Sequence, residues 1–323
     1  MTGASWRPSI AQAGAPGHDE HMLDPDFLLD ADGRDRLIAR FGAGVNSWCA
    51  ALPQLVERCC LRWQLELDQA LSGNTSRVFI GRQRGDSGVV LKLTPDRAIA
   101  IEEAQALRAW DATPHVVDLL DADLAAGALL LAKIEPGTKV SDEPDLPPVS
   151  EVAELLTGLR GAVSYDGGRL PTLAGGLESM FARIGGLLSD PRVSPVVAPH
   201  LLAQGHRLAR ELAGSGPAGL LHGDLHLSNI LRAGPARGLV AIDPRPCSGD
   251  LTFDAIDWVL DRATSANEVY QRIDQLGGLV PDLDRDRLRR WCQATAAAIA
   301  VLRLRHHSPD GTTRFLLQFA AVS

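Results

Sequence analysis

The stretch LHGDLHLSNILRAGPARGLVAID, residues 221–243, is the most informative part of the chain. An apolar run leads into Asp224, Asn229 follows five positions later, and a second apolar run ends at Asp243. The segment between the two runs contains Gly234-Pro235 and Gly238, which favour a hairpin turn. Loops at strand ends can bring these three polar side chains within a few ångströms of one point, whereas a single helix could not at these spacings.

Two carboxylates and an amide gathered in this way suit the transfer of a phosphoryl group from ATP. One carboxylate orients the attacking hydroxyl and accepts its proton, while an Asn oxygen and a second carboxylate hold the Mg²⁺ ions that neutralise the phosphates. In the alternative interpretation, Asp224 and Asn229 are turn residues and Asp243 caps a helix. The combined pattern, with His222 and Gly223 directly before Asp224, favours the catalytic interpretation.

Residues 222–229, followed by Ile242-Asp243-Pro244, resemble the aminoglycoside-phosphotransferase family, which has a bilobal protein-kinase-like fold. Further phrases are similar to its streptomycin 6-kinase and hydroxyurea phosphotransferase branch: Trp110-Asp111, Leu129-Leu130-Leu131, Glu135-Pro136-Gly137 and Asp243-Pro244-Arg245-Pro246. The resemblance covers about residues 46–262. It implies an α+β fold with a small antiparallel-sheet lobe before a larger, mainly helical lobe.

The resemblance also implies an activity. ATP would donate its γ-phosphoryl group, Asp224 would be the catalytic base, and Asn229 and Asp243 would bind Mg²⁺. The acceptor would be a small molecule, either an aminoglycoside such as streptomycin or hydroxyurea. A metabolic kinase for a sugar or an amino alcohol, a protein kinase and a nucleotide-binding pseudokinase scaffold remain as alternatives. The presence of Lys92, Asp224, Asn229 and Asp243 argues against the scaffold.

A lysine in the first half of the chain fits the same activity. Lys92 lies on an apolar predicted strand, where an unpaired ammonium group would be costly to bury. In kinases such a lysine contacts the nucleotide phosphates and is held by a glutamate. Glu103 is preferred over Glu102 for this role, because it shares a helix face with Leu107 and Trp110. An ordinary surface salt bridge is the alternative.

Two more segments are candidates for nucleotide binding. Residues 72–76 contain only Gly73 and so lack the sequence G-x-G-x-x-G, but a tight turn with hydroxyl side chains such as Ser76 can cradle phosphates. A plain hairpin turn is the alternative. Lys133 and Ile134 fit the hinge whose backbone would meet adenine, an assignment that rests on the resemblance alone.

Two departures separate the chain from protein kinases. Gly223 stands where their catalytic motif has Arg, and Asp243 is followed by Pro244-Arg245 instead of the Phe-Gly of a D-F-G motif. Without that Arg, a phosphorylated activation loop has no evident partner. Both departures favour a small-molecule kinase without a phosphorylation switch.

The composition restricts partners and location. The 323 residues carry a net charge of -8, which argues against nucleic acid because phosphate backbones demand a basic surface. No apolar stretch approaches the roughly 18 residues of a membrane span, and the N-terminus does not resemble a secretory signal. Five cysteines without C-x-x-C spacing indicate reduced thiols, so a cytoplasmic location is expected. The oligomeric state stays open.

The hydrophobic pattern also predicts the organisation of the chain. Residues 1–20 are expected to be disordered, 21–136 to form N-terminal helices and a small lobe, and 137–323 to form a helical lobe with the catalytic loop. The predicted strands are 63–67, 77–82, 89–93, 116–120 and 128–134. The predicted helices are 33–41, 46–62 with Pro53 in a first turn, one from Pro95, 148–163, 176–188, 198–214, 253–275, 286–307 and 311–322.

Charged residues near the C-terminal half leave two interpretations open. Asp250, Asp254, Asp257 and Asp261 form an acidic series that would either contact a cationic acceptor or cap and solvate a helix. The arginines between 285 and 290 alternate with acidic and apolar residues, which is typical of a solvated helix.

Overall fold

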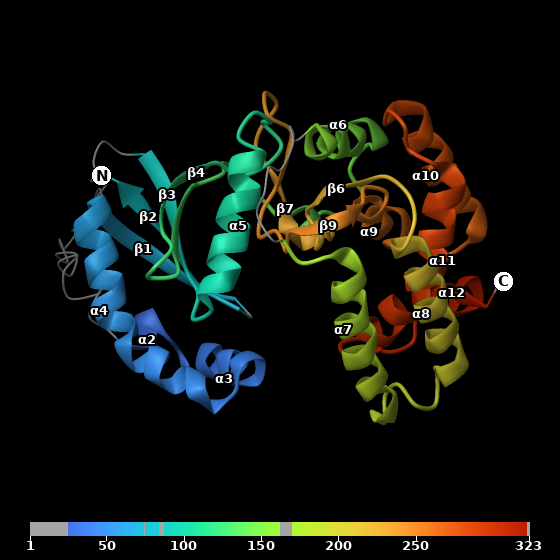
Figure 1. The fold of residues 1–323 in the computed structure, drawn as a ribbon, viewed down its shortest axis with the longest axis horizontal. Helices are drawn as coiled ribbons and strands as arrows, with labels where there is room; N and C mark the ends of the chain where they lie inside the picture. The colour runs from blue at the N-terminus through green and yellow to red at the C-terminus, as the bar shows by residue number, and fades with distance from the viewer. Residues whose placement is uncertain (1–24, 74, 84–86, 162–169, 322–323) are drawn as a thin grey trace, which may run out of the picture. The chain divides into compact units, whose positions relative to one another are not determined.

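The computed structural model describes residues 25–73, 75–83, 87–161 and 170–321, and Figure 1 shows their helices and strands. The predicted disorder of residues 1–20 lies outside this part of the chain. The chain divides into two compact units, residues 1–95 and residues 96–323.

The first unit combines helices with three antiparallel strands. Its elements are α2 (Pro25–Leu28), α3 (Ala31–Phe41), the 3₁₀ turn η1 (Ala43–Val45), α4 (Asn46–Trp63), β1 (Leu65–Ser72), β2 (Arg77–Gln83) and β3 (Ser87–Leu93). Strand β2 pairs with both β1 and β3, and α2 and α4 pack against β1. The strands predicted at 77–82 and 89–93 are confirmed. The strand predicted at 63–67 begins only at Leu65, because Gln64 ends α4 in a left-handed conformation at φ 55°, and it extends to Ser72.

Helix α4 differs from its prediction at one residue. Pro53 lies in the interior of the helix, so its placement in a first turn was wrong. A proline there removes one backbone hydrogen bond, which normally destabilises a helix. The helix nevertheless buries an apolar face that includes the predicted residues Leu55, Val56, Cys59 and Cys60. Burial of this face offsets the cost of the proline.

The second unit opens with a helix and a hairpin. Helix α5 (Arg97–Ala109) is capped by Asp96, whose carboxylate accepts from the Ala98 N–H at 3.0 Å. Strands β4 (Leu119–Asp123) and β5 (Ala128–Ala132) pair antiparallel. Instead of starting β4, Val116 forms an isolated parallel bridge with Ala241.

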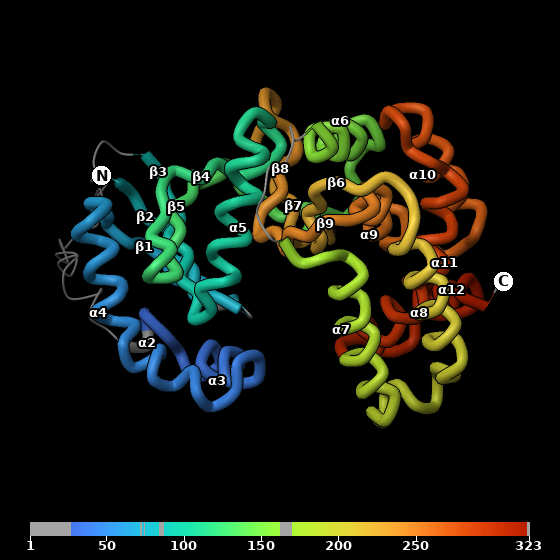
Figure 2. Tube along the Cα trace, in the orientation of Figure 1, coloured from blue at the N-terminus to red at the C-terminus, as the bar shows by residue number. Residues whose placement is uncertain are grey.

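The rest of the second unit is mainly helical. Its longer helices are α6 (Val149–Arg160), α7 (Leu173–Gly186), α8 (Pro199–Ala213), α10 (Ala266–Leu279), α11 (Arg285–Leu304) and α12 (Gly311–Ala320), with the 3₁₀ turns η2 (Val140–Asp142) and η3 (Leu187–Ser189). Helix α11 packs against α8, α10 and α12, as Figure 2 shows, and its alanine-rich middle is buried. The small alanine side chains allow these neighbours to approach closely.

Two short antiparallel strand pairs lie among these helices. Strand β6 (Ala218–Leu221) pairs with β9 (Cys247–Asp250), and β7 (Ile230–Arg232) pairs with β8 (Leu239–Ala241). The predicted hairpin after Asn229 is thus confirmed, and the 3₁₀ turn η4 (Leu227–Asn229) precedes it.

The predicted helix over 253–275 is wrong in its middle. The chain forms η5 (Phe253–Ala255), α9 (Ile256–Leu260) and then a break before α10. At the break Arg262 takes a left-handed conformation at φ 53°, and the Ser265 hydroxyl caps α10 by accepting from the Glu268 N–H at 3.3 Å. A serine cap restarts the helix, which the hydrophobic pattern alone did not reveal.

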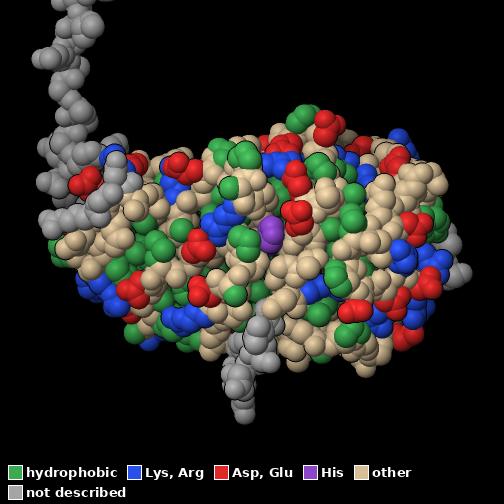
Figure 3. All heavy atoms as spheres, turned by 90° about the horizontal axis from the view of Figure 1, so that it is seen from above, with side chains coloured by type: hydrophobic (Ala, Val, Ile, Leu, Met, Phe, Trp, Pro, Cys, Tyr) green, Lys and Arg blue, Asp and Glu red, His purple; other side chains and the backbone are tan. Residues whose placement is uncertain are grey.

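No helix within the described part of the chain is long and apolar enough to cross a membrane. Among the coloured residues on the face drawn in Figure 3, Lys and Arg side chains are interspersed with Asp and Glu side chains. This face therefore carries no broad basic patch.

Candidate active site

The loop between β6 and β7 carries Asp224 and Asn229. The Asn229 side chain is buried, and its Nδ2 donates to the Asp224 backbone oxygen at 2.9 Å and lies 3.5 Å from Asp224 Oδ2. A backbone carbonyl can only accept, so the amide nitrogen must face it and the amide oxygen must point elsewhere. The loop thus fixes the orientation of the Asn229 amide.

His226 sits between these two residues. Its Nε2 lies 3.3 Å from Asn229 Nδ2 and 3.7 Å from Asp224 Oδ1, and its Nδ1 lies 2.7 Å from Ser228 Oγ. In the tautomer whose Nε2 accepts from Asn229, the proton is on Nδ1 and is donated to Ser228. His226 therefore lies beside both Asp224 and Asn229 in this loop.

Gly223 allows the loop to pass close to the segment after β8. Its φ is +75°, and a Cβ at this position would lie 2.2 Å from the Arg245 carbonyl oxygen. The Arg245 N–H in turn donates to the His222 oxygen at 2.8 Å. Glycine is required here by both conformation and space, which explains in physical terms why no larger residue stands before Asp224.

A buried carboxylate anchors the same loop. Asp254 accepts from the backbone N–H groups of His222 at 2.8 Å and of Gly223 at 2.9 Å, one with each oxygen. Its burial raises the pKa of the carboxyl to about 6, while these two hydrogen bonds oppose the rise. Asp254 does not cap a helix, because the caps of η5 and α9 are Thr252 and Ala255, but it does lie in the first turn of η5.

Asp243 stands at the open end of the β7–β8 hairpin. The Ile242 N–H donates to the Asn229 oxygen at 2.9 Å, so the residue before Asp243 is bonded to Asn229. Asp243 itself adopts a left-handed conformation at φ 56°. The structure therefore brings Asp224, Asn229 and Asp243 to one place, as their spacing predicted.

Burial and the charges around Asp224 shift the pKa of its carboxyl in opposite directions. Burial raises the pKa of Asp224, His226 and Arg245 lower it, and Asp243 raises it. The side chain is still 41% exposed, so it can reach a bound molecule. A base works best when its pKa lies near the working pH, and the direction of this shift moves Asp224 toward that range.

Lys92 and Glu103 are both buried charged residues. Lys92 lies on β3 of the first unit, and Glu103 lies on α5 of the second unit. Glu102, the competing residue, is only partly buried, and burial raises the pKa of its carboxyl.

The structure also shows the surroundings of the residues predicted to form the phosphate loop and the hinge. Gly73 and Ser76 flank residue 74, which lies outside the described residues, and a Cβ on Gly73 would be 3.0 Å from the Ser76 carbonyl oxygen. Ser76 is buried. Lys133 and Ile134 follow β5, where Ile134 is buried and the Lys133 ammonium pairs with Glu135 at 2.9 Å.

The acidic series and the arginines of α11 include a buried pair. The Asp250 carboxylate accepts from the Arg287 guanidinium and the Trp291 indole N–H, and also from the Thr252 N–H at 3.0 Å. The Asp250 side chain is 1% exposed and that of Arg287 13%, so the solvated-helix interpretation was wrong for Arg287. Asp250 joins β9 to α11 and does not cap a helix.

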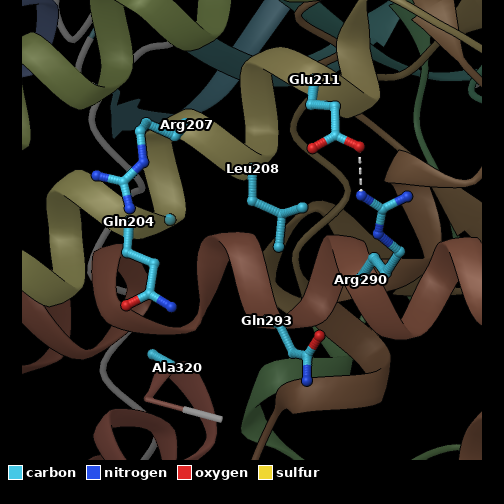
Figure 4. Close-up of a pocket in the computed structure, with 8 residues that line it drawn as sticks. Gln204, Arg207, Leu208, Glu211, Arg290, Gln293 and Ala320 are labelled. Atoms are coloured by element: carbon cyan, nitrogen blue, oxygen red, sulfur yellow. Dashed lines mark hydrogen bonds and ion pairs between the residues drawn. The ribbon is translucent and has the colours of Figure 1, made fainter. Parts of the chain in front are cut away.

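A separate pocket of about 500 Å³ is lined mainly by α8 and α11 of the second unit (Figure 4). Gln204, Arg207 and Glu211 of α8 line it together with Arg290 and Gln293 of α11, and Glu211 pairs with Arg290 at 2.6 Å. None of the lining residues is a predicted site residue, so this cavity is not the candidate active site.

Comparisons with known proteins show the family of the chain. Residues 62–306 match the family described as aminoglycoside/hydroxyurea antibiotic resistance kinase. The hydroxyurea phosphotransferase of Kitasatospora aureofaciens is 34% identical over 256 residues, covering 77% of this chain and 72% of the relative. The streptomycin 6-kinase of Streptomyces glaucescens is 32% identical over 260 residues, covering 78% of this chain and 82% of the relative.

A solved structure shows the same fold. The choline kinase LicA from Streptococcus pneumoniae superposes with a TM-score of 0.55 at 13% identity, over 83% of this chain and 96% of that one. The chain belongs to the aminoglycoside/hydroxyurea antibiotic resistance kinase family, which confirms the resemblance of its sequence. It is a phosphotransferase that acts on a hydroxyl group.

Proposed function

We propose that the chain transfers the γ-phosphoryl group of ATP to a hydroxyl of an aminoglycoside such as streptomycin, with hydroxyurea as the second candidate acceptor. Both acceptors are supported by relatives of similar identity, 32% for the streptomycin 6-kinase and 34% for the hydroxyurea phosphotransferase. The observation that carries the proposal is the loop in which Asn229 donates to the backbone of Asp224 at 2.9 Å.

Asn229 and Asp243 are the proposed Mg²⁺ ligands. Mg²⁺ takes oxygen ligands and is commonly held by one or two carboxylates together with substrate phosphates. The Asn229 amide nitrogen is engaged by Asp224, which leaves the amide oxygen for a cation. Within the residues described, no group of three or more His, Cys, Asp or Glu is arranged to hold a metal ion. A bound Mg²⁺ would neutralise charge on those phosphates.

Asp224 is the proposed catalytic base. Its carboxylate orients the acceptor hydroxyl and takes the hydroxyl proton while the acceptor oxygen forms a bond to the γ-phosphorus. The bond between the γ-phosphorus and the bridging oxygen breaks, and ADP carries away that electron pair. Asp254 keeps Asp224 in place by fixing the two preceding backbone N–H groups.

The remaining predicted residues are assigned to the nucleotide. We assign Lys92 to the phosphates, Glu103 to holding Lys92, the turn of Gly73 and Ser76 to covering the phosphates, and the backbone of Lys133 and Ile134 to adenine. Lys92 is 5% exposed and Glu103 is 1% exposed, and buried charges require a partner of opposite sign. Each of these two side chains has a polar or electrostatic partner in the folded chain.

The same proposal extends to domains, acceptor and location. Residues 21–136 would form the nucleotide-binding lobe and residues 137–323 the catalytic lobe. Asp257, which interacts electrostatically with His226 and Asp224, would contact a cationic acceptor. The five buried cysteines fit the reducing cytoplasm, and the net charge of -8 fits a chain without a nucleic-acid partner.

ATP turnover by the purified protein against streptomycin, other aminoglycosides, hydroxyurea and choline tests the proposal. Streptomycin or hydroxyurea should stimulate turnover, and Asp224→Ala or Asp224→Asn should lower kcat by about 10²–10⁴-fold. The rise in Tm caused by Mg²⁺-ATP should persist in both variants. Failure of every compound except choline would contradict the proposed acceptor, and equal loss of turnover and nucleotide binding would contradict the role of Asp224.

A further inference from the structure

The hairpin of β7 and β8 determines where the two proposed metal ligands lie. Strand β7 begins directly after Asn229, and β8 ends two residues before Asp243. The hydrogen bond of 2.9 Å from the Ile242 N–H to the Asn229 oxygen closes the hairpin at this end. A shift of the hairpin would therefore move Asn229 and Asp243 together.

Backbone hydrogen bonds join β7 to the segment that follows Ile134. The Arg232 N–H donates to the Thr138 oxygen at 2.9 Å, and the Gly137 N–H donates to the Arg232 oxygen at 3.0 Å. Lys139 adds an antiparallel bridge with Leu231. Arg232 is thus the residue at which the hairpin is hydrogen-bonded to residues 137–138, which follow the predicted hinge.

The Arg232 side chain reinforces this junction. Its guanidinium makes a two-pronged pair with Glu143, with Nε at 2.7 Å and Nη2 at 2.9 Å from the two carboxylate oxygens, and Nη1 bonds to Glu151. Glu143 follows η2, and Glu151 lies in the first turn of α6. One side chain therefore connects β7, the loop after η2 and the start of α6.

The charges make this connection dependent on the arginine. Hydrogen bonding from Arg232 lowers the pKa of the Glu143 carboxyl, and Glu143 and Glu151 raise the pKa of Arg232. The three side chains are only 22–33% exposed, so water screens them incompletely. Loss of the guanidinium would leave two neighbouring carboxylates that repel each other.

We infer that Arg232 is a positioning residue that fixes the β7–β8 hairpin, and through it Asn229 and Asp243, for the binding of Mg²⁺-nucleotide. The inference rests on the proposed function of Asn229 and Asp243 as metal ligands. Groups that orient metal ligands without touching the metal commonly change metal affinity or activity when they are removed. Arg232 would orient Asn229 and Asp243 in this way by holding the hairpin that carries both.

Arg237 offers a matched control in the turn of the same hairpin. Its guanidinium pairs with Asp118 at 3.0 and 3.2 Å and also bonds to the backbone oxygens of Pro114 and Val116. Its side chain is 24% exposed, compared with 27% for Arg232. Both arginines are partly buried and paired with a carboxylate, but Arg232 lies on β7, three residues after Asn229, whereas Arg237 lies in the turn.

The experiment compares Arg232→Gln with Arg237→Gln. Calorimetry should show that Arg232→Gln weakens binding of Mg²⁺ with a non-hydrolysable ATP analogue by about tenfold, whereas Arg237→Gln should bind like the wild type. In the absence of any ligand, hydrogen exchange of the backbone amides of residues 230–242 should become faster in Arg232→Gln but not in Arg237→Gln. The Mg²⁺ concentration for half-maximal turnover should rise in parallel.

Two further variants keep the test decisive. Arg232→Lys retains the charge but not the two-pronged geometry, so it should fold and bind with an affinity between those of wild type and Arg232→Gln. Glu143→Gln should reproduce the effect on binding from the opposite side of the pair. Equal effects of Arg232→Gln and Arg237→Gln would overturn the inference, as would unchanged binding and exchange in both Arg232→Lys and Glu143→Gln.

Failure of the proposed function would look different. In that case the wild type itself would show no phosphotransfer to any acceptor or no Mg²⁺-dependent nucleotide binding. The exchange of amides 230–242 in the ligand-free variants would still report whether Arg232 positions the hairpin.

Discussion

The substitution Gly223→Ala places a single methyl group at the closest approach in the candidate active site. A Cβ on residue 223 would lie 2.2 Å from the Arg245 carbonyl oxygen, at least 0.8 Å closer than the 3.0 Å below which real Cβ contacts are essentially absent. Neither side can yield easily. Asp254 holds the Gly223 N–H at 2.9 Å, and the Arg245 N–H is bonded to the His222 oxygen at 2.8 Å.

The expected loss has two parts. Alanine at a φ of +75° costs about 1–2 kcal/mol of stability because its Cβ crowds the backbone. Relief of the contact requires the loop or the segment after β8 to move by nearly 1 Å, which displaces Asp224 relative to Asp243. Misplacement on this scale costs about 10²-fold in rate. We therefore expect kcat to fall by about two orders of magnitude while the protein stays folded.

Gly238→Ala provides the control, because it separates strain from contact. Gly238 lies in the turn of the β7–β8 hairpin at φ +67°, and no atom lies within 4 Å of its added Cβ. Both variants carry the left-handed strain, but only Gly223→Ala carries the collision. The assay is steady-state phosphotransfer to the acceptor found in the panel, with Tm measured for both variants.

A folded Gly223→Ala protein with nearly wild-type kcat would refute the reasoning, since the loop would then tolerate the displacement. Equal losses of kcat in Gly223→Ala and Gly238→Ala would also refute it. The left-handed strain would then account for the effect, and the contact with Arg245 would not matter.

Three further predictions concern carboxylates that stabilise the second unit. Asp254→Asn replaces one of the two accepting oxygens by an NH₂ donor that faces a backbone N–H. The free energy of unfolding should therefore fall by about 1.5–3 kcal/mol in chemical denaturation, and kcat should fall with it. An unchanged kcat would contradict the anchoring role. Asp250→Asn leaves the Arg287 guanidinium buried without its counter-charge, so the free energy of unfolding should fall by about 3–5 kcal/mol. A loss of stability no larger than that of an exposed ion pair would contradict this prediction. Asp310 caps α12 by accepting from the Thr313 N–H and hydroxyl, and the backbone hydrogen bond lowers its pKa to about 2. Because this pKa is below the usual value of about 3.9, the stabilisation is present at neutral pH and is lost as the pH falls toward 2. Asp310→Ala should therefore cost about 1 kcal/mol at pH 7 and progressively less below pH 4 in denaturant titrations.

The sequence predicted the centre of the site well because that part is local. Asp224, Asn229 and Asp243 lie within 20 positions of one another, and the turn between the two apolar runs brings them together. The hairpin register, Ile230 with Ala241, follows from these short runs. Local patterns of this kind can be read without knowledge of the tertiary fold.

The supports of the site could not be predicted in the same way. Asp254 lies 31 positions after Gly223 and Arg287 lies 37 positions after Asp250, and only the packing of distant segments brings each pair together. In the sequence both aspartates precede a helical pattern, where a capping role is the ordinary expectation. Their burial is what distinguishes them, and burial is a property of the folded chain.

The same distinction explains why two glycines that look alike in the sequence differ in consequence. Gly223 and Gly238 both take positive φ, and either could be explained as a turn residue. Only at Gly223 does a second segment, held by the His222 backbone and by Asp254, occupy the space that a side chain would need. The expected loss of activity at Gly223 comes from the neighbouring segment that the fold places against it. A resemblance can therefore identify such a glycine, but only the packed structure gives the physical reason for it.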